Sequence, residues 1–111
     1  MSDIETLNRY QLEALRTASM SPDWDFRKLI FGLGIAGEAG EVADLIKKEV
    51  GHGHPIDIQK MTSELGDVLW YLACLADTYG LSLSDVASYN INKLKARYPE
   101  GFSTEASVNR E

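Results

Sequence analysis

Cysteine and long apolar runs are scarce in this sequence of 111 residues. Cys74 is the single cysteine, which excludes an internal disulfide framework and fits a reducing compartment such as the cytoplasm. No apolar run approaches the roughly 20 residues that a membrane-spanning helix needs. The first ten residues are acidic and polar, unlike a secretory signal peptide. We therefore expect a cytoplasmic protein with no membrane partner.

Basic residues are also few. The 11 lysines and arginines are outnumbered by 17 aspartates and glutamates, and the net charge is -6. Because phosphate contacts along a duplex need a basic surface, this balance argues against a nucleic acid polymer as the partner, although not against a small phosphate ligand held through a metal ion. The 44% apolar content excludes intrinsic disorder. The length predicts a single domain over residues 1–111, with a radius of gyration of about 13 Å if it is compact.

Proline is infrequent, and its three positions divide the chain into segments of helical length. No run alternates apolar and polar residues as a half-buried strand would, whereas the first segment repeats apolar residues at steps of three and four. The pattern predicts an all-α protomer that resembles a four-helix bundle. The helices are expected at about residues 3–20, 25–50, 57–79 and 84–97, followed by a polar tail over residues 98–111 that frays.

Two of the expected helices carry acids in apolar surroundings. Glu38 and Glu41 are the only charged residues between positions 30 and 43, and Asp67 is the only one between positions 65 and 76. A helix that is apolar all round is typical of a buried helix. Glu64 precedes Asp67 by three residues, so each helix presents a pair of carboxylates on one face. If these faces are opposed, four acids converge inside the bundle.

Electrostatic magnitudes favour a metal site over an ordinary solvated face. Desolvating one ionised carboxylate costs several kcal/mol. Two such charges about 6 Å apart repel by roughly 3 kcal/mol at an effective dielectric constant of 20. A whole domain is stable by only about 5–15 kcal/mol. The usual explanation of paired helical glutamates, a solvated face, is weakened by the apolar flanks, so we expect Mg²⁺, with Mn²⁺ as a substitute, at Glu38, Glu41, Glu64 and Asp67.

Gly34, Gly37 and Gly40 recur at steps of three beside the first acid pair. Each costs a helix about 1 kcal/mol relative to alanine, so their number calls for an explanation. They fall along one inclined strip, which we interpret as tight packing against a neighbouring helix. Trp24, Trp70 and Tyr71 are interpreted as core or interface residues, with stacking on a nucleobase as the alternative.

The last expected helix offers groups that could bind phosphate. Asn90, Lys93 and Arg97 share one stripe, and Lys48 ends the second helix. An amide, an ammonium and a guanidinium can all donate hydrogen bonds to phosphate oxygens, although a solvated polar face explains the same stripe. His52 and His54 lie in a glycine-rich loop, which we interpret as solvated rather than as a metal site.

The runs GEAGEVADLIKK, SELGDVLWYLACLA and NINKLKARYP resemble the MazG-like members of the all-α nucleoside triphosphate pyrophosphohydrolase superfamily. The resemblance covers about residues 29–102. It implies Mg²⁺-dependent hydrolysis of an NTP or dNTP to the monophosphate and pyrophosphate, for cleansing or adjusting a nucleotide pool. It also implies assembly as a homodimer or homotetramer. The motifs match Glu38, Glu41, Glu64 and Asp67 to the metal-binding acids, and Asn90, Lys93 and Arg97 to positions near the phosphates.

One position departs from the pattern of some relatives, which carry a further glutamate directly before the first motif acid. This chain has Gly37 there, so the water-activating base is either Glu38 or a hydroxide held by the metal.

Two other classes of protein are considered. A di-iron bundle oxidase needs Glu-x-x-His pairs on two helices, and this spacing occurs once here, at Glu49 and His52 at the end of the second expected helix. The alternative to the enzyme is a non-catalytic or weakly active helical interaction module with the same fold.

Overall fold

The computed structural model describes residues 4–109, and helices are the regular structure in that range. The all-α prediction is therefore confirmed. The chain order is α1 (Leu7–Leu15), α2 (Trp24–Ile46), a π-helical turn η1 (Lys47–Gly51), α3 (Ile58–Thr78), α4 (Leu83–Arg97) and α5 (Thr104–Val108).

Side-chain caps set the helix starts close to the expected positions. The Asp23 carboxylate accepts hydrogen bonds from the backbone N–H groups of the first turn of α2, and Asp57 accepts one from Lys60 N at 3.1 Å to begin α3. Ser82 caps α4 in the same way. After α3, Gly80 adopts a φ of 73°, the left-handed conformation that glycine tolerates and that stops a helix.

The first helix is shorter than expected, and the tail is more ordered. Thr6 accepts a hydrogen bond from Arg9 N, so α1 begins only at Leu7 rather than near residue 3. Thr17 then donates through its hydroxyl to Ala14 O at 2.7 Å, and tighter turns end the helix at Leu15. In the tail, Ser103 caps the short helix α5. The remaining tail residues 110 and 111, and residues 1–3 of the first segment, lie outside the described range.

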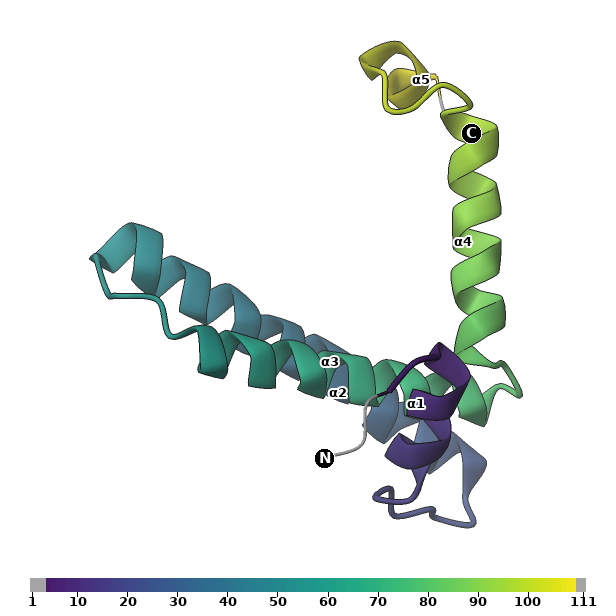
Figure 1. Cartoon of the computed structure of the whole chain (residues 1–111). Helices are drawn as coiled ribbons and strands as arrows, with labels where there is room; N and C mark the ends of the chain where they lie inside the picture. Colours follow the sequence, from purple (N-terminus) through teal and green to yellow (C-terminus); the bar gives the residue numbers. More distant parts are fainter. Residues whose placement is uncertain (1–3, 110–111) are drawn as a thin grey trace.

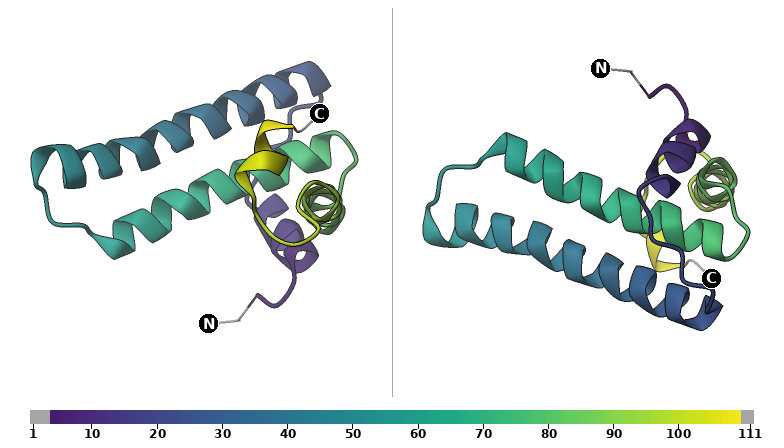
Figure 2. Two further views of the ribbon diagram at one scale, coloured as in Figure 1. Left: turned by 90° about the horizontal axis from the view of Figure 1, so that it is seen from above. Right: turned by 90° about the horizontal axis from the view of Figure 1, so that it is seen from below.

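The centre of the molecule is an antiparallel hairpin of α2 and α3 (Figure 1). Views from above and below show these helices side by side, with α1 and α4 together at the end where α3 finishes (Figure 2). Gln11 ties this end together, because its amide donates to Ala73 O and Leu81 O while accepting from Leu83 N, all at 3.1 Å. Trp70 adds a bond to the Thr17 hydroxyl at 2.8 Å.

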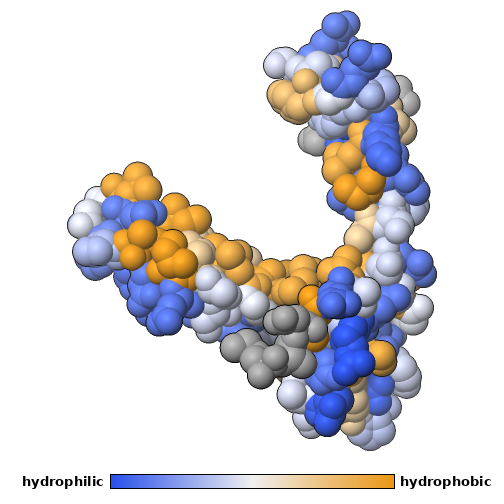
Figure 3. Space-filling view, in the orientation of Figure 1, coloured by the Kyte–Doolittle hydropathy of each residue, from blue (hydrophilic) through white to orange (hydrophobic). Residues whose placement is uncertain are grey.

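The single chain is open rather than compact. Its radius of gyration is 16.9 Å, well above the 13 Å or so of a compact chain of this size. Its accessible surface is 8283 Å², against about 6,100 Å² for a typical folded monomer of this mass. The reason is that α4 rises away from the hairpin, and apolar side chains line the space between them (Figure 3). The exposed residues include Leu29, Leu33, Ile58, Leu65, Leu72, Val86, Tyr89 and Ile91.

The buried core is correspondingly small. Ala14, Ala73 and Leu83 form it, with Trp70 packed against them. Cys74 is fully buried beside them. Burial, followed by the charge of Asp77, raises the pKa of Cys74 to about 11, so the thiol stays protonated at neutral pH. Within the described range, no helix has the length and apolar character needed to cross a bilayer.

Candidate metal centre

Three of the four expected acids meet between α2 and α3. Glu38 projects from α2, and Glu64 and Asp67 project from α3 one turn apart. One carboxylate oxygen from each lies within 4.8 Å of the other two. The helices bring them together because the antiparallel pairing opposes the face that carries Glu38 to the face that carries the Glu64–Asp67 pair. We call these three residues the acid cluster.

The electrostatics of the acid cluster show the strain of gathering like charges. Partial burial raises the pKa of Glu38, and a hydrogen bond to Glu64 raises it further. The negative charges of Asp67, Glu64 and Glu41 act in the same direction. Two carboxyl groups can share a hydrogen bond only if one of them holds a proton. The metal-free cluster therefore favours a protonated Glu38, and a cation would take over the role of that proton.

The donor set and its spacing fit a hard divalent cation. Carboxylate oxygen is the ligand type that Mg²⁺ and Mn²⁺ prefer. Ligand oxygens around one octahedral Mg²⁺ lie about 3.0 Å apart when adjacent and about 4.2 Å apart when opposite, so oxygens spread over as much as 4.8 Å would draw together by up to roughly 2 Å to share one ion. Glu38, Glu64 and Asp67 would hold such an ion.

Glu41 lies at the border of this centre. It follows Glu38 by three residues on α2, and its charge contributes to the raised pKa of Glu38. Its side chain is exposed, and it is not among the three acids whose oxygens converge.

Lys48 lies on η1, two turns beyond Glu41, and already has a partner. Its ammonium is 2.8 Å from a carboxylate oxygen of Asp44, while Lys47 is 3.4 Å from the other oxygen. The hydrogen bond from Lys48, above all, lowers the pKa of Asp44. The same pair raises the pKa of Lys48, so this ammonium stays charged. A phosphate would have to compete with Asp44 for it.

Asn90, Lys93 and Arg97 occupy the second half of α4. That half is the part of α4 that stands away from the α2–α3 hairpin (Figure 1). Asn90 and Lys93 are exposed, and the Arg97 guanidinium lies 6.0 Å from the centroid of the Tyr98 ring. One chain therefore does not bring the expected phosphate-binding residues together with the acid cluster.

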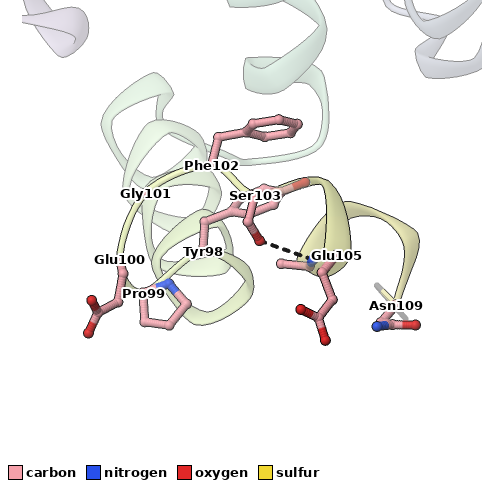
Figure 4. Close-up of a pocket in the computed structure, with 9 residues that line it drawn as sticks. Tyr98, Pro99, Glu100, Gly101, Phe102, Ser103, Glu105 and Asn109 are labelled. Carbon is pink, nitrogen blue, oxygen red and sulfur yellow. Dashed lines mark hydrogen bonds between the residues drawn. The ribbon is translucent and has the colours of Figure 1, made fainter.

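A cavity of about 410 Å³ lies at the far end of α4 (Figure 4). Tyr98 and Phe102 line it, with ring centroids 5.4 Å apart. Ser103 also lines the cavity and caps α5. The cavity contains none of the expected site residues. It is separate from the acid cluster, which lies in the hairpin.

Tyr10 is a neighbour of the acid cluster that the sequence did not indicate. Burial raises the pKa of this tyrosine, and electrostatic interactions with Cys74 and Asp67 raise it further. Its hydroxyl therefore stays protonated at neutral pH. A tyrosine on an amphipathic helix has no distinguishing sequence signal, because its proximity to Asp67 arises only when α1 packs on α3.

These features define an all-α protein with a carboxylate centre suited to a divalent cation, set between two antiparallel helices. The chain belongs to the MazG nucleotide pyrophosphohydrolase domain family, whose model matches residues 28–102. That range holds the acid cluster and the whole of α2 beyond its first turn, α3 and α4, and it confirms the resemblance found in the sequence.

Two relatives are similar to this chain over much of its length. The Gene 37 protein of Mycobacterium phage L5 is 38% identical over 82 residues, which cover 70% of this chain and 72% of the phage protein. The uncharacterized protein YvdC of Bacillus subtilis (strain 168) is 37% identical over 70 residues, covering 55% of this chain and 66% of YvdC. No solved structure gives a significant match.

Proposed function

We propose that this protein hydrolyses a nucleoside triphosphate, an NTP or a dNTP, to the monophosphate and pyrophosphate, with Mg²⁺ as its cofactor and Mn²⁺ as a substitute. The observation that carries the proposal is the convergence of Glu38, Glu64 and Asp67 within 4.8 Å in a chain of the MazG family. The cellular role that follows is the cleansing or adjustment of a nucleotide pool.

The acids of the chain would hold the cofactor, and one of them has a further role. When bound, the divalent ions neutralise charge on the phosphate oxygens and lower the pKa of water. Glu64, Asp67 and Glu41 serve as ligands. Glu38 serves as a ligand and is proposed as the acceptor of the proton from the attacking water. No other acid adjoins it on its N-terminal side, where Gly37 stands.

The phosphate contacts are proposed to come from a second copy of the chain. Asn90, Lys93 and Arg97 would donate to phosphate oxygens, but α4 holds them away from the acid cluster of the same chain. A homodimer or homotetramer in which α4 of one chain meets the hairpin of another would complete the site. The excess of about 2,000 Å² of accessible surface is the amount that an obligate interface buries per partner.

A helical interaction module without turnover is the alternative, and the exposed apolar surface is the observation that favours it. The two are separated by one assay. A panel of canonical and modified NTPs and dNTPs is incubated with the protein and Mg²⁺, and pyrophosphate is measured. We expect release from at least one nucleotide, abolished by chelation and in Glu38→Gln and Asp67→Asn. Full activity in both variants would rule out the assigned centre, and no release from any nucleotide would favour the module.

A further inference from the structure

Gly34 of α2 is in direct contact with the aromatic ring of Tyr71 on α3. A Cβ atom at position 34 would lie closer than 3.0 Å to three atoms of that ring. A Cβ at Gly32, Gly37 or Gly40 would meet nothing within 4 Å. Among the glycines of α2, Gly34 is thus the one whose missing side chain makes room for a neighbouring helix in the described chain.

This contact lies one helical turn from the acid cluster. Glu38 follows Gly34 by four residues on α2, and Asp67 precedes Tyr71 by four residues on α3. Because residues four apart share a helix face and the two helices are antiparallel, the register that opposes Gly34 to Tyr71 also opposes Glu38 to Asp67. The separation along the axis is about 6 Å.

The ring is held in place by its surroundings. Trp70 packs edge-on against Tyr71, with ring centroids 5.0 Å apart, and Phe31 of α2 packs edge-on against Trp70 at 6.0 Å. The Trp70 indole also donates to Thr17 of the segment after α1. A ring fixed against a bare backbone acts as a spacer, because close-packed interiors transmit changes of volume rather than absorb them.

The distance between α2 and α3 affects metal affinity because the site has few ligands and the divalent cation requires a narrow range of bond lengths. Mg²⁺ and Mn²⁺ need short bonds to oxygen, and outer residues that orient ligands change metal affinity by about 10- to 100-fold. A wider or narrower gap one turn away moves the Glu38 carboxylate relative to both acids of α3.

We propose that Tyr71 is a positioning residue for the metal centre: its ring, seated on the α2 backbone at Gly34, sets the distance between Glu38 and the acids of α3 and thereby the affinity for the divalent cation. This inference rests on the metal centre of the proposed function. It assigns Tyr71 no contact with the substrate.

The test measures Mn²⁺ binding by calorimetry with the full chain, without nucleotide. Gly34→Ala introduces the clash, Tyr71→Leu removes the ring, and Tyr71→Phe keeps the ring without its hydroxyl. We expect the Kd for Mn²⁺ to rise about tenfold or more in the first two variants and to stay within about twofold in Tyr71→Phe. The matched control, Gly32→Ala, makes the same chemical change two residues away and should keep the wild-type Kd.

The double variant Gly34→Ala/Tyr71→Leu tests whether the change in Mn²⁺ affinity comes from the contact between these two residues or from general damage to the fold. In a Tyr71→Leu background the clash is gone, so Gly34→Ala should raise the Kd by less than about threefold more. Circular dichroism confirms that each variant is folded, and if Gly34→Ala is not, the contrast between Tyr71→Leu and Tyr71→Phe decides. Unchanged affinity in folded Gly34→Ala and Tyr71→Leu overturns the proposal, as does loss in Tyr71→Phe or a wild-type chain that binds no Mn²⁺. Nucleotide hydrolysis is assayed separately, so the proposed function can fail while this inference stands.

Discussion

The carboxyl groups of Glu38 and Glu64 meet across the α2–α3 interface, with oxygens within 4.8 Å of each other, although both are acids. Burial and the interaction with Glu64 raise the pKa of Glu38, because a proton shared between two carboxyl groups relieves their repulsion. Proton and divalent cation are therefore alternative ways to relieve the same repulsion.

The first prediction concerns stability against pH. The folded metal-free chain holds a proton on Glu38 above pH 4.5, the ordinary pKa, where the unfolded chain releases it. Stability contributed by this group is thus full below pH 4.5 and falls as pH rises to the raised pKa. Thermal melts in EDTA should show the melting temperature falling as pH rises above 4.5, and Mg²⁺ should restore the melting temperature at pH 7.5. Glu38→Gln should flatten the fall and lose the Mg²⁺ response; an equal Mg²⁺ shift in that variant would contradict the assignment.

The second prediction ranks two ligands. Glu64 belongs to the converging cluster, whereas Glu41 is exposed at its border. We expect Glu64→Gln to lower kcat/KM for the substrate found in the panel by about 100-fold or more, and Glu41→Gln to lower it less. The two variants are matched in chemistry, so steady-state kinetics at saturating Mg²⁺ compares position alone. An equal or larger loss in Glu41→Gln would show that the bound state draws Glu41 fully into the centre.

The third prediction concerns the junction of α1, α3 and α4. Gln11 is buried and makes three hydrogen bonds to backbone groups there, and removing its amide leaves those partners unsatisfied. Gln11→Ala should cost about 2–4 kcal/mol of the free energy of unfolding, measured in urea. Asn8→Ala is the matched control, because Asn8 accepts a single exposed bond from Ser84 N and water can replace it. Equal costs for the two variants would show that burial of the junction is not what stabilises it.

The fourth prediction concerns assembly. Leu33 is 63% exposed in the middle of α2, in a chain whose surface is too large for a monomer of its size. Light scattering coupled to gel filtration should give the mass of a dimer or tetramer. Leu33→Asp should shift it toward the monomer, whereas Arg16→Asp, an exposed site on the polar end of α1, should not. A wild-type monomer at micromolar concentration would remove the proposed source of the phosphate contacts.

Local sequence determined the elements. Asp57 and Gly80 bound α3 through a cap and a left-handed stop, both of which act over a few residues and need no tertiary partner. The end of α1 was less predictable, because it depends on the Thr17 hydroxyl, which also accepts from Trp70, a residue 53 positions away.

The spacing of acids in apolar helices determined by itself that this protein gathers carboxylates, because helical periodicity puts residues three apart on one face. Tertiary structure decided which of them meet. The antiparallel register of α2 and α3, with Tyr71 against Gly34, opposes Glu38 to Glu64 and Asp67 and leaves Glu41 at the border. It also decided where Asn90, Lys93 and Arg97 stand, since long-range hydrogen bonds between Gln11 and the residues Leu81 and Leu83 fix the start of α4. Periodicity fixes the face of one helix, whereas distances between helices come only from packing.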